Sequence, residues 1–169
     1  DQRLINPLLP DDPNSKVNTC IKNVFSIWDK YKDKKSAQLI FCDMSTSSSD
    51  FNIYDDIKTK LIDMGVPENE IEFIHKAKNN MEKDAIFDKV RKGEIRVLLG
   101  STQKMGAGTN AQDKLIAIHD LDIPWRPADL SQRAGRIVRQ GNENKEVHIF
   151  RYVTENTFDA YLWVRHEVA

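Results

Sequence analysis

The sequence has 169 residues, which is long enough for one domain with a substantial core. Its 25 basic and 26 acidic residues nearly cancel, so nucleic acid could be held only by a local basic patch and not by a general positive field. Two cysteines exclude a disulfide framework and a cysteine metal site, and no apolar run reaches membrane-spanning length. We expect Cys42, inside an apolar run, to pack as a small hydrophobe in a reducing, cytoplasmic environment.

The first elements in chain order are an irregular arm and a helix. Residues 1–15 hold three of the six prolines, which predicts irregular chain. Ser15 is placed to cap a helix. Apolar side chains then recur at helical spacing: Val17, Ile21, Val24 and Trp28. The apolar run at 37–44 suits a buried strand better than a helix.

Helices and strands alternate through the rest of the chain. Residues 50–65 predict an amphipathic helix with an apolar stripe and Gly65 as its stop; the stripe is Ile53, Ile57, Leu61 and Met64. Further strands are expected at 71–75, 95–101, 115–122 and 146–153. Further helices are expected at 81–93, closed by Gly93, and at 127–141 and 155–168. This alternation predicts an α/β domain with a mainly parallel central sheet and helices on both faces.

Ligands of such sheets bind beyond the carboxyl ends of the strands, so the segments after each strand are the candidate site. These segments are rich in Ser, Thr, Gly and Lys. Asp43, Asp120 and Asp122 also follow strands. They could serve acid–base catalysis, but aspartates in this position are more often turn formers, and we interpret them as structural. The four histidines have no neighbour at metal-ligand spacing, so no metal site is expected.

A basic helix is predicted within "SQRAGRIVRQGN", residues 131–142. Gln132, Arg136 and Arg139 share one face, roughly opposite an apolar stripe. This face is either solvated or directed at a phosphate. No carboxylate within the helix stands four residues from either arginine, and Gly135 allows another surface to approach closely. Both features favour an external anion.

A glycine-rich segment follows the strand at 95–101. In "LLGSTQKMGAGTNAQ" a loop carries Gly100, Gly106 and Gly108 among hydroxyl and amide side chains. Such a loop can offer backbone N–H groups to a phosphate, although a plain turn between strands has the same composition. It is not a Walker A loop, and the pattern G-x-x-x-x-G-K-[ST] occurs nowhere in the chain.

Three segments, taken in order, resemble motifs four, five and six of superfamily-two helicases: "AQLIFCDMST", "GSTQKMGAGTN" and "HDLDIPWRPADLSQRAGRIVRQG". The resemblance is closest to Snf-type DNA translocases and covers about residues 37–154. More narrowly, the chain resembles the helicase portion of large helicase–DNA methylase proteins of bacterial conjugative elements and phages. Gly135 departs from the acidic residue usual in chromatin remodellers, and the long insertions of those proteins are absent.

The resemblance implies a three-layer RecA-like domain, the second of two, that belongs to a DNA-dependent ATPase. It implies an arginine finger at Arg139, a second γ-phosphate ligand at Arg136 and an orienting contact at Gln132. Other residues would lie at the same nucleotide cleft: Gly106, Gly108 and Asn110. DNA-backbone contacts are implied for Ser45, Thr46, Ser101 and Thr102, and Lys76 and Lys104 could add local positive charge, unless they are merely solvated.

ATP and Mg²⁺ would be bound mainly by a first RecA-like domain of the same chain, so residues 1–169 alone should be inactive. The expected organisation is an arm and lead-in helix (1–36), the RecA-like domain (37–154) and a helix leading to a further region (155–169). The expected partners are DNA, the first RecA-like domain and a fused DNA methylase, with no membrane. The alternatives are a non-catalytic RecA-like domain that binds DNA or protein, and a free-standing phosphate-binding metabolic enzyme; the latter would need an acid–base pair that the sequence does not offer.

Overall fold

In the part of the chain that the structure describes, five parallel strands form one sheet. The computed structural model describes residues 11–43, 52–105, 112–122, 142–144 and 146–153. The strands are β1 (Ala37–Phe41), β2 (Ile71–Phe73), β3 (Val97–Gly100), β4 (Leu115–Asp120) and β5 (His148–Arg151). Their spatial order is β2-β3-β1-β4-β5, and every neighbouring pair is parallel. The α/β class with a parallel sheet, predicted from the sequence, is confirmed.

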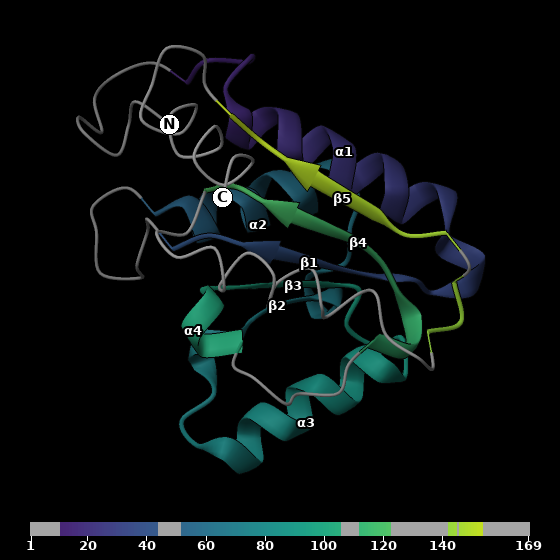
Figure 1. Cartoon of the computed structure of the whole chain (residues 1–169). Coiled ribbons are helices and arrows are strands. Elements are labelled where there is room, and N and C mark those ends of the chain that lie inside the picture. Colours follow the sequence, from purple (N-terminus) through teal and green to yellow (C-terminus); the bar gives the residue numbers. More distant parts are fainter. Residues whose placement is uncertain (1–10, 44–51, 106–111, 123–141, 145, 154–169) are drawn as a thin grey trace, which may run out of the picture.

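Helices cover both faces of the sheet, as expected. They are α1 (Lys16–Lys30), α2 (Ile53–Met64), α3 (Asn80–Arg91) and the short α4 (Thr102–Met105). Figure 1 shows α1 and α2 on one face and α3 and α4 on the other. Single turns of 3-10 helix join several elements: η2 (Lys32–Lys34), η3 (Glu68–Glu70), η4 (Ile74–Lys76) and η5 (Gln112–Lys114). No helix in the described part of the chain is long and apolar enough to span a membrane.

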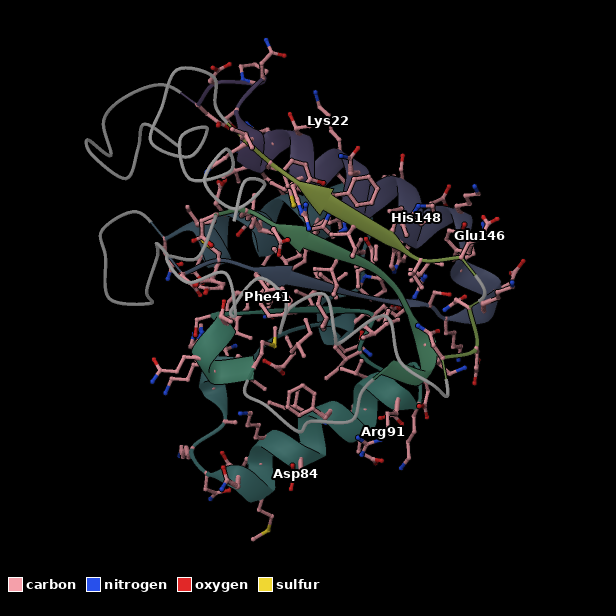
Figure 2. The ribbon with its side chains drawn as sticks, viewed as in Figure 1. Lys22, Phe41, Asp84, Arg91, Glu146 and His148 are labelled. Carbon is pink, nitrogen blue, oxygen red and sulfur yellow. The ribbon has the colours of Figure 1, made fainter. Side chains whose placement is uncertain are left out.

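Each face of the sheet has its own hydrophobic core. Along β1, Ile40 packs with α1 and α2, whereas Leu39 and Phe41 pack with α3. This alternation follows from the two-residue period of a strand, and it explains why β1 is apolar on both faces. In Figure 2 the exposed side chains Lys22 and Asp84 lie on the outer surfaces of their helices, away from Phe41.

The helix boundaries follow the local signals in the sequence. Ser15 caps α1, because its Oγ accepts a bond from the N–H of Asn18 at 3.2 Å. Gly65 ends α2 with φ of 123°, and Gly93 follows α3 with φ of 81°. The predicted stripe of α2 is correct except at its end, where Met64 is 42 % exposed.

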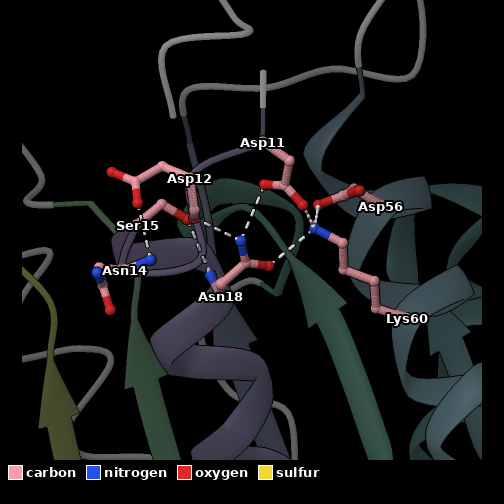
Figure 3. A network of polar contacts seen from close by, with 7 residues as sticks. All are labelled: Asp11, Asp12, Asn14, Ser15, Asn18, Asp56 and Lys60. Atoms are coloured by element: carbon pink, nitrogen blue, oxygen red, sulfur yellow. Dashed lines mark hydrogen bonds and ion pairs between the residues drawn. The ribbon is translucent and has the colours of Figure 1, made fainter.

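A polar network joins the start of α1 to α2 (Figure 3). Asn18 donates to Asp11 Oδ1 at 2.9 Å and to the carbonyl of Asp12 at 2.7 Å. The ammonium of Lys60 lies 2.8 Å from Asn18 Oδ1, 2.6 Å from Asp11 and 3.0 Å from Asp56. These contacts fix the ends of two helices that cover the same face of the sheet.

A buried arginine organises the amino edge of the sheet. The Arg96 guanidinium is 4 % exposed and donates to the carbonyls of Ser36, at 3.0 Å, and Trp28, at 2.9 Å. Glu70 accepts a bond from the Trp28 indole N–H at 2.9 Å and lies 4.0 Å from the guanidinium. Arg96 therefore ties the end of α1 to the start of β1, and its role is structural.

Candidate nucleic-acid interface at the carboxyl edge of the sheet

The segments after the strands meet at one edge of the sheet, because all the strands are parallel. Four of the predicted site residues lie there in the described structure: Lys76, Ser101, Thr102 and Lys104. The others lie outside the described residues: Ser45, Thr46, Gly106, Gly108, Asn110, Gln132, Arg136 and Arg139. The described chain leaves this edge at Asp122 and resumes at Asn142, which donates to the carbonyl of Leu115 at the opposite edge.

The glycine-rich segment begins differently from the loop that was expected. After β3 the chain forms the helical turn α4, which packs against η4 at the end of β2. Gly100 makes this contact possible, since a Cβ there would lie 2.3 Å from Ile74 Cγ2 and 3.0 Å from Met105 Cε. No real Cβ contact is so short, so only glycine fits without moving η4. The first glycine of the segment is therefore a packing residue.

The contact between α4 and η4 gathers positive charge at this edge. Lys76 ends η4, Lys104 lies in α4, and both are exposed. Burial, then the charge of Lys76 and more weakly that of Lys104, lower the pKa of His75, although Asp55 and Glu72 oppose the shift. The charges of both lysines thus lower the pKa of the same imidazole. Lys76 and Lys104 therefore form one cationic patch.

Aromatic rings pack against this cationic patch. The ammonium of Lys76 lies 5.3 Å from the ring centroid of Phe73, and the Phe73 ring stacks at 5.3 Å on His75. Tyr54 packs against both rings and donates its hydroxyl proton to the carbonyl of Cys42. The exposed Lys76 ammonium thus makes a cation–π contact with the Phe73 ring.

Ser101 and Thr102, adjacent in sequence, have different surroundings. Ser101 is partly exposed, and its Oγ accepts a bond from the N–H of Lys104 at 3.1 Å. Accepting this bond does not use the hydroxyl proton, which can still be donated to a phosphate oxygen. Thr102 is 7 % exposed, and both its N–H and its hydroxyl donate to Asp43, at 2.7 and 3.0 Å.

Two aspartates at this edge have partners that the sequence did not indicate. Asp43 accepts both bonds from Thr102, and its own N–H donates to Oδ2 of the buried Asp122. The interpretation of strand-end aspartates as structural agrees with these contacts. Their position after β1 and β4 was the available signal, but only the strand order shows that β1 lies between β3 and β4.

Behind the edge, a buried chain of hydrogen bonds crosses the layer between α1 and the sheet. His119 on β4 is fully buried, with Nε2 2.7 Å from Gln38 Oε1 and Nδ1 2.8 Å from the Tyr152 hydroxyl. Gln38 Nε2 donates to the carbonyl of Val24, and Asn23 Nδ2 donates to the Tyr152 oxygen. These donors assign the proton to Nε2 of a neutral imidazole. Accordingly, burial lowers the pKa of His119 to about 3.

Comparison with known families agrees with this architecture. Residues 15–141 match the family described as "Helicase conserved C-terminal domain". The chain belongs to this family. The match includes 123–141, the segment of the predicted arginine helix, and most of the residues around the carboxyl edge. The RecA-like fold that the sequence motifs implied is therefore established, and the chain contains a helicase conserved C-terminal domain.

Two curated proteins share parts of this helicase domain. The uncharacterized ATP-dependent helicase YqhH of Bacillus subtilis (strain 168) is 40 % identical over 81 residues, which are 48 % of this chain and 14 % of that protein. Defense against restriction protein B of Escherichia phage P1 is 36 % identical over 59 residues, 35 % of this chain and 3 % of that protein. The chain thus spans only a small fraction of the curated relatives it matches.

Solved structures show the same helicase fold. The C-terminal part of the Fun30 ATPase domain superimposes with a TM-score of 0.66 at 21 % identity, over 95 % of this chain and 49 % of that one. The DUF1998 helicase MrfA bound to DNA gives a TM-score of 0.62 at 19 % identity, over 94 % of this chain and 21 % of that one. At this identity the likeness establishes the fold alone.

Proposed function

We propose that this chain is the C-terminal RecA-like half of a Snf-type DNA helicase or translocase, whose carboxyl edge holds the DNA backbone. One observation carries the proposal: Lys76, which is distant in sequence from Ser101 and Lys104, lies with them at one edge of a domain of the helicase family. Because the chain has a formal net charge of −1, a phosphate backbone would have to bind at such a local cationic patch.

The chemistry of this patch suits a protein that moves along DNA. Ammonium groups and a hydroxyl bind phosphate oxygens but do not distinguish one base pair from another. Such contacts can be made and released repeatedly at any sequence. Ser45 and Thr46 follow Asp43 after one intervening residue, and we assign them to the same backbone contact.

The nucleotide side of the proposal rests on the sequence of the arginine segment and on the family match through residue 141. Arg139 would be the arginine finger and Arg136 a second γ-phosphate ligand, with Gln132 orienting the phosphates. Gly106, Gly108 and Asn110 would line the same cleft. Guanidinium groups at this place neutralise charge that develops during phosphoryl transfer.

ATP and Mg²⁺ would be held mainly by a first RecA-like domain. Within the described residues, no group of three or more His, Cys, Asp or Glu side chains is arranged to hold a metal ion. The lysines and the Ser101 hydroxyl at the carboxyl edge suit an anion. This chain would contribute positive charge to the nucleotide, and the Mg²⁺ ligands would belong to the other domain.

The proposal also includes a DNA methylase domain fused to the same protein and a location in the bacterial cytoplasm. The likeness to a phage P1 protein supports an origin in a mobile element. The motif order, in which a Ser-Thr segment precedes a Trp-Pro element and an arginine helix, supports the Snf-type assignment. Residues 1–169 alone, without a Walker A loop, should not hydrolyse ATP.

The decisive experiment compares Arg139→Lys with Arg133→Lys in the full-length protein at saturating DNA. Lysine cannot reproduce the planar, multi-donor guanidinium, so Arg139→Lys should lose most of kcat with a much smaller change in KM for ATP. Arg133 lies off the predicted face, and Arg133→Lys should keep near-normal turnover. If Arg139→Lys stays within about threefold of wild type, less than ~1 kcal/mol in barrier, the arginine face is only solvated and the domain is a non-catalytic binding module.

A further inference from the structure

Three strand ends are joined by hydrogen bonds through one residue, Asp43. Its backbone N–H donates to Asp122 after β4, and its carboxylate receives two bonds from Thr102 after β3. Asp122 is buried at 4 % exposure, whereas Asp43 is exposed. The buried carboxylate thus anchors the backbone of an exposed residue, whose side chain in turn holds the next segment.

These bonds restrict what Thr102 can do. A phosphate oxygen only accepts hydrogen bonds, and Thr102 has two polar donors, its N–H and its hydroxyl. Both donate to Asp43. A phosphate could bind Thr102 only after displacing the carboxylate, so this residue is poorly placed to hold DNA directly.

Ser101 differs from Thr102 because its hydroxyl proton is not used by the bond that it accepts from Lys104. The position of Ser101 relative to the sheet depends on the next residue, Thr102. Asp43 fixes Thr102 by accepting hydrogen bonds from both its N–H and its hydroxyl. Lys104 lies in the turn that begins at this point. Holding Thr102 therefore sets the place of Ser101 and Lys104, two of the groups that the proposed function assigns to DNA.

We propose that Asp43 is a positioning residue that fixes the Ser101–Lys104 segment for binding of the DNA backbone. Through its N–H it also ties this segment to Asp122, which follows β4. The proposal rests on the proposed function, and it replaces direct phosphate binding by Thr102 with an indirect role. It predicts that Asp43 and Thr102 act as one unit.

A double-mutant cycle in the full-length protein tests this unit. Asp43→Ala removes the acceptor of both bonds, whereas Thr102→Val removes only the hydroxyl donor and keeps the backbone N–H bond. The third variant combines both changes, and Thr102→Ser keeps the hydroxyl. The measurement is the concentration of duplex DNA that half-maximally stimulates ATP hydrolysis, alongside the rate without DNA. Asp43→Ala should raise this concentration by about five- to tenfold, as expected when charge-assisted hydrogen bonds are removed, and Thr102→Val should raise it by less because one bond remains. The double variant should be no worse than Asp43→Ala alone, and Thr102→Ser should resemble wild type.

Glu70→Ala serves as the matched control for a general fall in stability. It removes the acceptor of Trp28 at the opposite edge of the sheet, far from the proposed contact. Its DNA dependence should equal that of wild type. Amide hydrogen exchange of residues 101–104 should accelerate in Asp43→Ala and not in Glu70→Ala, which reports the position of the segment without reference to activity.

The possible outcomes separate the two proposals. Additive effects of the two single variants would mean that Thr102 binds DNA independently, and they would overturn the role of Asp43. The same conclusion follows if Asp43→Ala behaves like Glu70→Ala, or if it lowers the rates with and without DNA equally. A wild-type protein whose ATP hydrolysis does not respond to DNA would refute the proposed function, and the role of Asp43 with it.

Discussion

Acidification should destabilise this domain through His119. The imidazole is fully buried between α1 and the sheet, where it stacks on Phe150 at 4.9 Å and bonds to Gln38 and Tyr152. Protonation would place a second N–H against the Tyr152 hydroxyl, whose oxygen already accepts from Asn23, and would bury a charge. The folded protein therefore keeps this residue neutral, and burial lowers its pKa from 6.5 to about 3.

The size of the effect follows from linkage. Between pH 6.5 and 3 the unfolded chain binds a proton that the folded domain does not bind, so stability falls as the pH falls through this window. Each pH unit well inside the window costs about 1.4 kcal/mol. From pH 7 to pH 5 the decrease in stability assigned to His119 is about 2 kcal/mol. Because pH 5 lies well above the folded pKa, this figure hardly depends on the exact folded value.

The assay compares wild type with His119→Asn, which offers a donor and an acceptor but does not titrate. Urea unfolding of the chain at pH 7 and pH 5, followed by circular dichroism, gives the free energy of unfolding of each. The variant should be less stable at pH 7, since it lacks the stacking and part of the network. Its further decrease in stability on acidification should be about 2 kcal/mol smaller than that of wild type. Equal decreases, within about 0.5 kcal/mol, would show that His119 is not held neutral by the fold.

Two further predictions concern the carboxyl edge. Lys76→Gln and Lys104→Gln in the full-length protein should each weaken DNA binding. Each should also reduce the slope of log K against log salt by about 0.9 for each phosphate that is no longer neutralised. Lys22→Gln on α1 should change neither the DNA affinity nor the salt slope. An unchanged salt slope in both edge variants would mean that these lysines are only solvated. Gly100→Ala should destabilise the chain by about 1–3 kcal/mol in urea unfolding, because the new Cβ overlaps Ile74. Ile74→Ala should therefore cost less stability in the Gly100→Ala background than in wild type. An equal cost of Ile74→Ala in both backgrounds would show that the overlap is not the cause.

The sequence by itself determined the elements and the class of fold. Helix boundaries depend on neighbours within one turn, so Ser15 and Gly65 could be assigned without knowledge of the rest of the molecule. Strands that are apolar on both faces require cover on both sides, which indicated a parallel sheet between two helical layers. The motif order identified the helicase family, which the family match confirmed.

The sequence also predicted where the candidate site lies, but only as an edge of the sheet. Parallel strands bring the segments that follow them together, so Lys76, Ser101 and Lys104 could be named as neighbours. That prediction needed no side-chain geometry. The roles of Arg136 and Arg139 stay predictions, because they lie outside the described residues.

The partners of each side chain were decided by the tertiary structure alone. Asp43 is 59 residues from Thr102 and 79 from Asp122 in sequence, and it meets both because β1 lies between β3 and β4. The strand order is set by how whole helices cover the two faces, which no local pattern encodes. A hydrogen bond also requires its two atoms within about 3 Å, a tolerance far finer than the spacing of neighbouring strands. The sequence could therefore place Thr102 at the carboxyl edge but could not show that Asp43 accepts both of its hydrogen bonds.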